Sequence, residues 1–168
     1  MPTLTVPSLP LRMLLSTDGS VTALLEASFA GPVVVRPLAN HVDDRLPTPF
    51  ELELASGRPV LWRHAVLEVA GRSVLRASSV IALDRLGEEA RRALLTTREP
   101  IGRVLRGVEV RRELLVASAA AATEADAAAL DIDEGDLLFE RTARIVGAGR
   151  PLALVSERIP ASIFDALP

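Results

Sequence analysis

Two apolar stretches on either side of a glycine-containing turn constrain the fold of this chain most strongly. Residues 60–70 and 74–84 are rich in valine, leucine and isoleucine, and the segment Gly71-Arg72-Ser73 separates them. β-Branched and aliphatic residues favour strands, and a short loop with glycine favours a direct reversal of the chain. The sequence therefore predicts a long antiparallel hairpin here.

A second hairpin is predicted near the C-terminus, and a further strand near the N-terminus. Residues 137–146 and 152–159 are strand-like and flank the turn-forming segment 147–151. A β-branched run begins at Val33, directly after Gly31-Pro32, and continues to about Asn40. Residues 41–58 have the composition of a loop, with one short extended piece expected at 50–54.

Helical patterns account for most of the remaining chain. Residues 11–29 predict two short helices around the turn 17–20, and residues 87–95 predict a surface helix. After a loop at 96–99, Pro100 begins the first turn of another helix over 100–105. Residues 107–119 are strand-like, whereas the alanine-rich stretch 119–129 fits either a helix or a connection. The chain is therefore expected to be α+β, with strands that pair mostly as antiparallel neighbours.

Composition narrows the classes of function. Of the 168 residues 49% are hydrophobic, enough for one core and one domain over residues 1–168. A net charge of -3 provides no broad positive field for nucleic acid. With no cysteine and two histidines, the chain is expected to use no metal. It contains no leader pattern and no apolar run of membrane-spanning length, so we expect a cytoplasmic protein without a membrane partner, and a monomer is favoured.

Arg63 is a candidate site residue because of the strand face that it shares. Alternate side chains of a strand point to opposite sides, which puts Arg63 with Leu61, Ala65 and Leu67 on an apolar face. A buried guanidinium requires a carboxylate or a bound anion as its partner. A core salt bridge, or a place at the strand edge where the guanidinium reaches water, also explains the pattern.

Glu157 is the second candidate, and the same alternation places it beside Val155 and Ile159. Burial raises the pKa of a carboxyl group and lets it hold a proton near neutrality, which suits acid catalysis or the binding of a hydroxyl group. The alternative is an ion pair with Arg63, Arg141 or Arg144.

Two further arginines lie on the predicted strand 137–146. Arg141 and Arg144 are on opposite faces, so at most one of them reaches the same pocket. Arg141 is the better candidate, although pairing at the surface with Glu140 or a neighbouring strand is favoured for both.

The histidines are not expected to carry chemistry. His64 follows Arg63 and therefore faces the opposite side of the strand, as a satisfied or exposed side chain. His41 lies beside Asp43 and Asp44, where a solvated loop is favoured over a metal site.

Several short motifs occur in an order and spacing that resemble one family, chorismate pyruvate-lyase. The resemblance spans about residues 14–164. Its motifs are DGSVT at 18–22, LWR at 61–63, TREPIGRVL at 97–105, GRP at 149–151 and ERIPAS at 157–162.

The resemblance implies a fold, an activity and four site residues. The family converts chorismate to 4-hydroxybenzoate and pyruvate without a cofactor, on a single antiparallel sheet of about six strands whose helices cover an enclosed ligand site. Its carboxylate-binding arginine falls on Arg63, and its hydroxyl-side glutamate on Glu157. Its two backbone-amide donors fall on Val21 and Ile101, where the family has methionine and leucine. Such a site would bind chorismate and the aromatic product, with Arg63 as the anchor and Glu157 assisting proton movement at the leaving ether oxygen.

Another class of protein fits the same pattern. Effector-binding modules of the UTRA type share the fold and also hold small anions with arginine, without catalysis. Such regulators carry an N-terminal winged helix, and the residues before Leu14 are too few for one. An enzyme acting on a related cyclohexadiene carboxylate is the third alternative.

Overall fold

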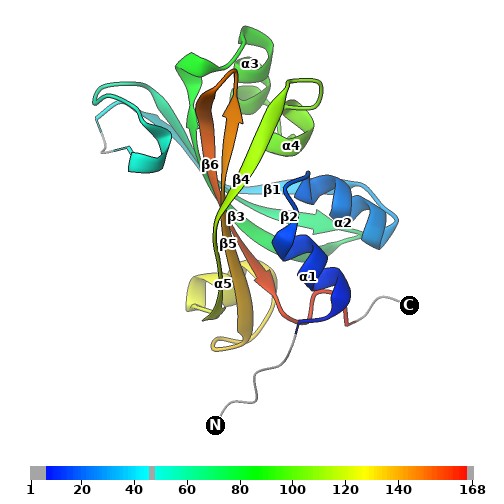
Figure 1. Cartoon of the computed structure of the whole chain (residues 1–168). Helices are drawn as coiled ribbons and strands as arrows, with labels where there is room; N and C mark the ends of the chain where they lie inside the picture. The colour runs from blue at the N-terminus through cyan, green and yellow to red at the C-terminus, as the bar shows by residue number, and fades with distance from the viewer. Residues whose placement is uncertain (1–6, 46–47, 166–168) are drawn as a thin grey trace.

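Six antiparallel strands form one sheet in the computed structural model, which describes residues 7–45 and 48–165 (Figure 1). The strands lie side by side in the order β1-β2-β3-β6-β5-β4. The α+β class and the single antiparallel sheet are thereby confirmed. The bounds of the strands are β1 Val33–Asp43, β2 Val60–Val69, β3 Arg72–Ala82, β4 Val110–Ala121, β5 Leu137–Gly147 and β6 Arg150–Pro160.

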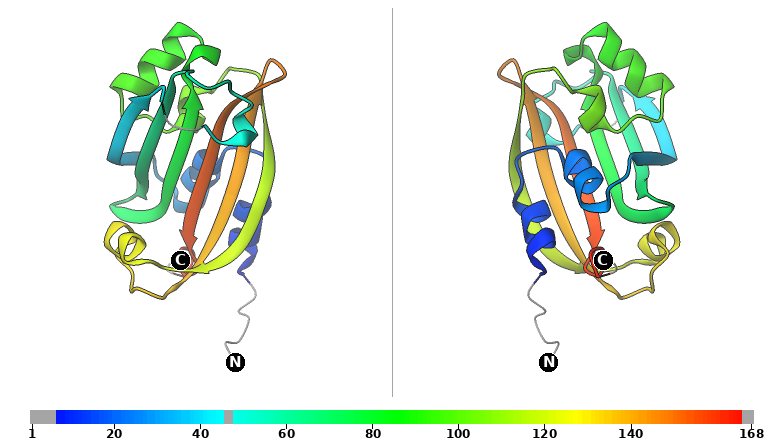
Figure 2. Two further views of the ribbon diagram at one scale, coloured as in Figure 1. Left: turned by 90° about the vertical axis from the view of Figure 1, so that its left-hand side faces the viewer. Right: turned by 90° about the vertical axis from the view of Figure 1, so that its right-hand side faces the viewer.

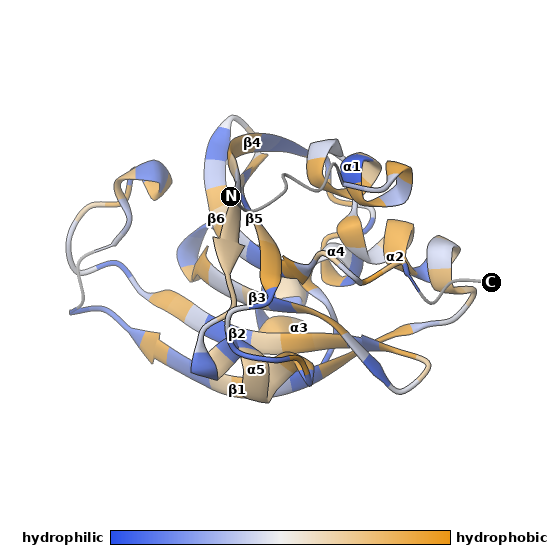
Figure 3. Cartoon of the chain, turned by 90° about the horizontal axis from the view of Figure 1, so that it is seen from below, coloured by the Kyte–Doolittle hydropathy of each residue, from blue (hydrophilic) through white to orange (hydrophobic). Residues whose placement is uncertain are grey.

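The helices are divided between the two faces of the sheet. We call the face that carries Leu61, Arg63 and Leu67 the inner face, and the opposite one the outer face. Figures 2 and 3 show α1, α2 and α4 gathered on one side of the sheet. The helices are α1 Leu9–Ser16, α2 Val21–Phe29, α3 Glu88–Thr96, α4 Ile101–Val104 and α5 Glu124–Leu130, with 3-10 turns η1 Phe50–Leu52 and η2 Leu83–Arg85.

Both predicted hairpins are confirmed, and they turn more tightly than expected. Ala70 and Gly71 connect β2 to β3, and Ala148 and Gly149 connect β5 to β6. All four residues have positive φ, at 50° and 75° in the first turn and 49° and 74° in the second. Two consecutive left-handed residues match the twist of the flanking strands, so each hairpin closes with two residues and its strands are long.

Two apolar clusters fill the inner face and leave a polar region between them. The first joins α1 and α2 to one end of the sheet through residues that include Leu14, Leu25 and Ile159. The second joins α3 and the segment after α4 to the other end, around Leu94 and Leu105. Because each helix pair packs against its own end of the sheet, the middle of the inner face is left for other side chains.

The outer face is covered only at its ends. There α5 packs on Val66 and Leu138, and η1 packs through Leu52 on Val60 and Val80. The extended piece expected at 50–54 is wrong, because Phe50–Leu52 forms a 3-10 turn that buries Leu52. No helix in the described part of the chain is long and apolar enough to span a membrane.

The alanine-rich stretch divides at one residue. Strand β4 continues to Ala121, and Thr123 then caps α5. The Thr123 hydroxyl accepts a hydrogen bond from the Asp126 backbone N–H, and the Asp126 carboxylate accepts one from the Thr123 N–H. This reciprocal pair satisfies two amides at the start of the helix and ends the strand there.

Candidate functional site

Arg63 lies on β2 and points to the inner face, where it is only 5% exposed. One terminal nitrogen donates a hydrogen bond of 2.8 Å to the carbonyl oxygen of Glu99, while the buried Nε has no hydrogen-bond partner. Among the residues that the structure describes, no carboxylate forms an ion pair with this guanidinium, so the core salt bridge considered from the sequence is not found. Burial lowers the pKa of Arg63, and the charge of nearby Glu99 opposes that shift. Within the described residues, Arg63 is therefore a buried cation with no carboxylate in ion-pair contact.

Glu157 lies on β6, with β3 between its strand and that of Arg63. Its side chain is 12% exposed, and its Oε2 lies 3.2 Å from Nε of Arg141 on β5. This contact is an ion pair without the alignment of a hydrogen bond, since the Nε has no hydrogen-bonded partner. Burial raises the pKa of Glu157, and the positive charges of Arg141 and Arg112 oppose the rise. A carboxyl group in this environment can hold a proton at a pH where an exposed glutamate is ionised.

Two adjoining cavities connect these residues beneath the covering helices. Each has a volume of about 40 Å³. Arg63 lines one of them, Arg141 and Arg112 line the other, and Glu157 lines both. The floor between the charged groups is made of small side chains, which leave room above the sheet: Ala65, Ala77, Ser79 and Ala143.

Val21 and Ile101 cover this space from above. Val21 is the first residue of α2 and lines one cavity, and Ile101 is the first residue of α4 and lines both. The first amides of a helix have no partner inside it, so both backbone N–H groups are free of intrahelical hydrogen bonds. The structure thus brings all four predicted site residues around one region.

The two covering helices approach each other closely at Gly102. A Cβ atom there would lie 2.8 Å from Oγ of Ser20 and 3.2 Å from Oγ1 of Thr22. Ser20 also caps α2 by accepting a hydrogen bond from the Ala23 backbone N–H. Glycine is therefore favoured at position 102 by the contact between the helices and not by its backbone conformation.

Arg103 holds the covering segments together. Its guanidinium lies 2.5 Å from the Glu26 carboxylate on α2 and 2.9 Å from that of Glu99. Glu26 also accepts a hydrogen bond from the Val33 backbone N–H, which lowers its pKa, with Arg103 as a further cause. These contacts connect α4, α2 and β1 beside the Glu99 carbonyl that accepts the hydrogen bond from Arg63.

Arg112 is the site residue that the sequence analysis missed. It lies on β4 opposite Ile145, is partly buried, and lines the same cavity as Glu157. Within residues 7–45 and 48–165 its guanidinium has no hydrogen bond and no ion pair. Burial lowers its pKa, the charge of Glu157 opposes the shift, and Arg141 adds to it. Strand alternation is the signal that could have identified it, because Val110 and Arg112 point to the same face.

The expectation for Arg141 is wrong about the surface location, whereas its ion pair with Glu157 on the neighbouring strand β6 is an alternative that the sequence left open. Arg141 is 1% exposed and donates hydrogen bonds of 2.5 and 3.0 Å to the carbonyl oxygens of Leu14 and Thr17, in addition to its contact with Glu157. Arg141 therefore joins the sheet to α1 and to Thr17 directly after it, which is a structural role. Glu140 instead lies 3.7 Å from Arg158.

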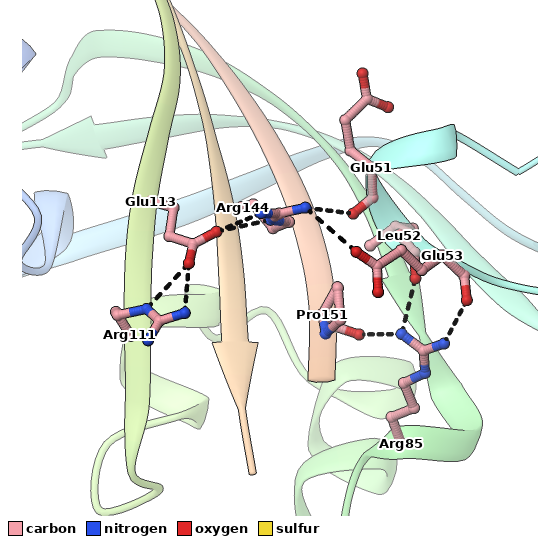
Figure 4. Close-up of polar contacts among 8 residues, drawn as sticks. All are labelled: Glu51, Leu52, Glu53, Arg85, Arg111, Glu113, Arg144 and Pro151. Atoms are coloured by element: carbon pink, nitrogen blue, oxygen red, sulfur yellow. Dashed lines mark hydrogen bonds and ion pairs between the residues drawn. The ribbon is translucent and has the colours of Figure 1, made fainter. Parts of the chain in front are cut away.

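Arg144 lies on the opposite face, as predicted, and belongs to a separate network (Figure 4). It pairs with Glu113 at 2.6 Å and with Glu53 at 3.7 Å, while Arg111 binds the other oxygen of Glu113. Arg85 donates to the carbonyl oxygens of Leu52, Glu53 and Pro151. This network fastens η1 to the edge of the outer face and does not reach the cavities.

Both histidines lie away from the cavities. His64 faces the outer side, where its Nδ1 is 2.9 Å from Oγ of Ser78. His41 stands in β1 rather than in a loop, and its ring stacks on Trp62 with centroids 6.2 Å apart. In the described part of the chain, no three side chains of types that bind metals lie close enough to share an ion.

A family model matches most of the chain. The model described as "Chorismate pyruvate-lyase Rv2949c-like" covers residues 15–166. A search of curated proteins gave no match.

Solved structures with a similar fold include domains of transcriptional regulators. PhnF from Mycobacterium smegmatis has a TM-score of 0.70 at 17% identity, over 86% of this chain and 65% of that one. The effector domain of the same protein has a TM-score of 0.67 at 16% identity, over 86% of this chain and 90% of the domain. The possible transcriptional regulator YydK from Bacillus subtilis has a TM-score of 0.64 at 14% identity, over 78% of this chain and 58% of that one. This chain thus spans little more than half of YydK, and at such identities the likeness concerns the fold.

Proposed function

The chain belongs to the Rv2949c-like chorismate pyruvate-lyase family, and we propose that it is a lyase that converts chorismate to 4-hydroxybenzoate and pyruvate without a cofactor. The observation that supports this proposal most is the pairing of unlike groups in one region. Within the described residues, a buried arginine with no carboxylate in ion-pair contact and a glutamate of raised pKa open onto the same space. The arginine can bind an anionic group of a ligand, and the glutamate can donate or accept a proton.

In the proposed mechanism Arg63 binds the ring carboxylate of chorismate. A guanidinium offers a planar pair of donors to a carboxylate, and the amides of Val21 and Ile101 would add donors from the covering helices. Because the site excludes most water, these contacts are stronger than at an exposed surface. Their main effect is to orient the ring beneath the covering helices.

Glu157 would act on the leaving group. The ring loses a proton and its carbon–oxygen bond to the enolpyruvyl group, the ether oxygen gains a proton, and the released enolpyruvate becomes pyruvate. Formation of the aromatic ring drives this elimination, so the protein has to position the substrate and assist proton movement. A protonated Glu157 is a group that can give a proton to the ether oxygen.

Turnover of chorismate by the purified protein tests the proposal. We expect 4-hydroxybenzoate and pyruvate in equal amounts, at a rate that EDTA does not change. Loss of activity with EDTA and its recovery with a divalent ion would contradict the mechanism. A folded wild-type protein that binds chorismate without forming either product would contradict the lyase itself.

An effector-binding role is the second candidate, and the likeness to regulator domains favours it. The effector domain of PhnF aligns over nine-tenths of its length. In that role the same cation would hold a small anion, and binding would be observed without turnover. The chorismate assay separates the two roles directly.

A further inference from the structure

The charges that line the two cavities do not balance. Three arginines, Arg63, Arg112 and Arg141, face one glutamate, Glu157. Glu157 neutralises at most one of these charges, and its nearest cation is Arg141 at 3.2 Å. In the described part of the chain, two positive charges therefore have no carboxylate in ion-pair contact, although Glu99 acts on Arg63 from a greater distance. Partly desolvated cations of this kind are stabilised by bound anions.

The two unbalanced cations lie in different cavities. Arg63 lines the cavity that extends toward β1 and β2, and Arg112 lines the one that extends toward β4. Glu157 and Ile101 line both, so the two cavities meet at these residues. Each cavity holds one cation without a carboxylate, and the proton-holding group lies where they join.

We propose that Arg112 binds the second carboxylate of the substrate, on the side of Glu157 away from the ring carboxylate that Arg63 binds. This inference rests on the proposed function and identifies the part of the site that takes the enolpyruvyl carboxylate. The cation at Arg112 makes the site selective for dicarboxylates over simple benzoates.

Neighbouring Arg111 provides a matched control. It lies one position away on the same strand and carries the same charge, but it is exposed and binds Glu113 at the outer network (Figure 4). Replacing Arg111 changes the net charge of the protein by the same amount as replacing Arg112. A difference in ligand affinity between the two variants is therefore caused by the position of Arg112 in the cavity and not by the net charge of the protein.

Two stable ligands test the inference by calorimetry without any turnover. One is a benzoate with a carboxymethoxy group at its meta position, and the other is the same benzoate with a methoxy group there. A charge-assisted hydrogen bond stabilises by about 1.5–3 kcal/mol, so the second carboxylate is expected to raise wild-type affinity by roughly tenfold to a hundredfold. Arg112→Gln should lose this gain, Arg112→Lys should keep part of it, and Arg111→Gln should keep all of it.

Arg63→Gln should instead weaken both ligands together, since both carry the ring carboxylate. The assignment would be overturned if folded Arg112→Gln still bound the dicarboxylate more tightly than the methoxybenzoate by the wild-type factor. It would also be overturned if Arg112→Gln weakened the binding of both ligands equally. Calorimetry and the turnover assay give separate answers for this inference and for the lyase reaction. A wild type that prefers the dicarboxylate but leaves chorismate intact would retain this inference and reject the reaction.

Discussion

At the scale of single residues, the two buried charges that touch each other contribute differently to the site. Arg141 has three partners, of which two are backbone carbonyls near α1 and α2, so most of its contacts are structural. Glu157 has Arg141 as its ion-pair partner and otherwise faces the cavities. The arginine fixes the position of the glutamate, while the glutamate keeps one side open toward a ligand.

Replacement of Glu157 by glutamine tests its role as an acid. A general acid must be protonated, so wild-type kcat is expected to fall as pH rises through the raised pKa of Glu157. Glu157→Gln has no acidic proton, and its kcat should be lower by about a hundredfold or more, without that alkaline decline. Steady-state kinetics from pH 5 to 9 measure both effects. If turnover is unchanged in the variant, Glu157 is a positioning group only.

Arg141→Met is expected to destabilise the fold as a whole. The substitution leaves two carbonyl oxygens and the Glu157 carboxyl without their buried partner, and loss of one member of a buried pair costs about 3–5 kcal/mol. Urea unfolding followed by circular dichroism gives the change. The control is Arg144→Met, whose ion pairs are nearer the surface and should contribute about 1 kcal/mol or less. Equal losses in the two variants would show that Arg141 is no more structural than Arg144.

At the scale of elements, the site depends on how α2 and α4 meet above the sheet. Their first turns lie over the cavities, Gly102 permits close approach, and Arg103 joins them through Glu26. A ligand much larger than a few water molecules needs these segments to separate before it can enter. The same contacts that enclose the site therefore control access to it.

Gly102→Ala should disturb this contact specifically. The new Cβ would lie 2.8 Å from the Ser20 hydroxyl, so either that hydroxyl must turn away from the Ala23 amide that it caps or the two helices must separate. We expect a higher KM for chorismate and a small loss of stability, both partly reversed by Ser20→Gly, which removes the hydroxyl. A control is Gly87→Ala, where φ is -62° and no atom lies within 4 Å of the added carbon. Additive effects of the Gly102 and Ser20 substitutions would argue against a direct clash.

Elements with strong local signals were predictable from the sequence, and ambiguous ones were not. The hairpins were predicted because a period of two and turn-forming residues agree there. The division of the alanine-rich stretch was missed, because alanine fits a strand or a helix equally well at that length. The decisive signal was Thr123 followed three residues later by Asp126, a capping pattern that the sequence contains.

At the scale of the whole molecule, the faces of Arg63 and Glu157 were predictable and their neighbourhood was not. Alternation along each strand gives the face, but the order of the strands depends on pairing between distant segments. Only the observed order puts β3 alone between the strands of Arg63 and Glu157, and brings Arg112 of the edge strand β4 to the same cavity. Local pattern therefore identified two site residues and missed the third.

The two edges of the sheet differ in how they discourage association. Strand β1 contains Arg36 and Pro37, a charged residue and a residue without a backbone N–H, which hinder the addition of another strand. Both edge strands have one irregularity in register, β1 between Pro37 and Ala39 and β4 between Leu114 and Val116, so the difference between the edges lies in their side chains. Strand β4 has no charged side chain from 114 to 121, and most of that stretch is exposed. It offers unpaired backbone groups along an apolar edge.

The colloidal behaviour of the protein should follow from this difference. At high protein concentration we expect molecules to associate by pairing strands at the β4 edge. Light scattering should then increase with time. Val116 is 49% exposed in the middle of that edge, and Val116→Lys places a charge there that should suppress the increase. A lysine at the equally exposed Val34, on the already protected β1 edge, should have much less effect. If both lysines reduce light scattering equally, the net charge of the protein and not the exposed β4 edge determines its solubility.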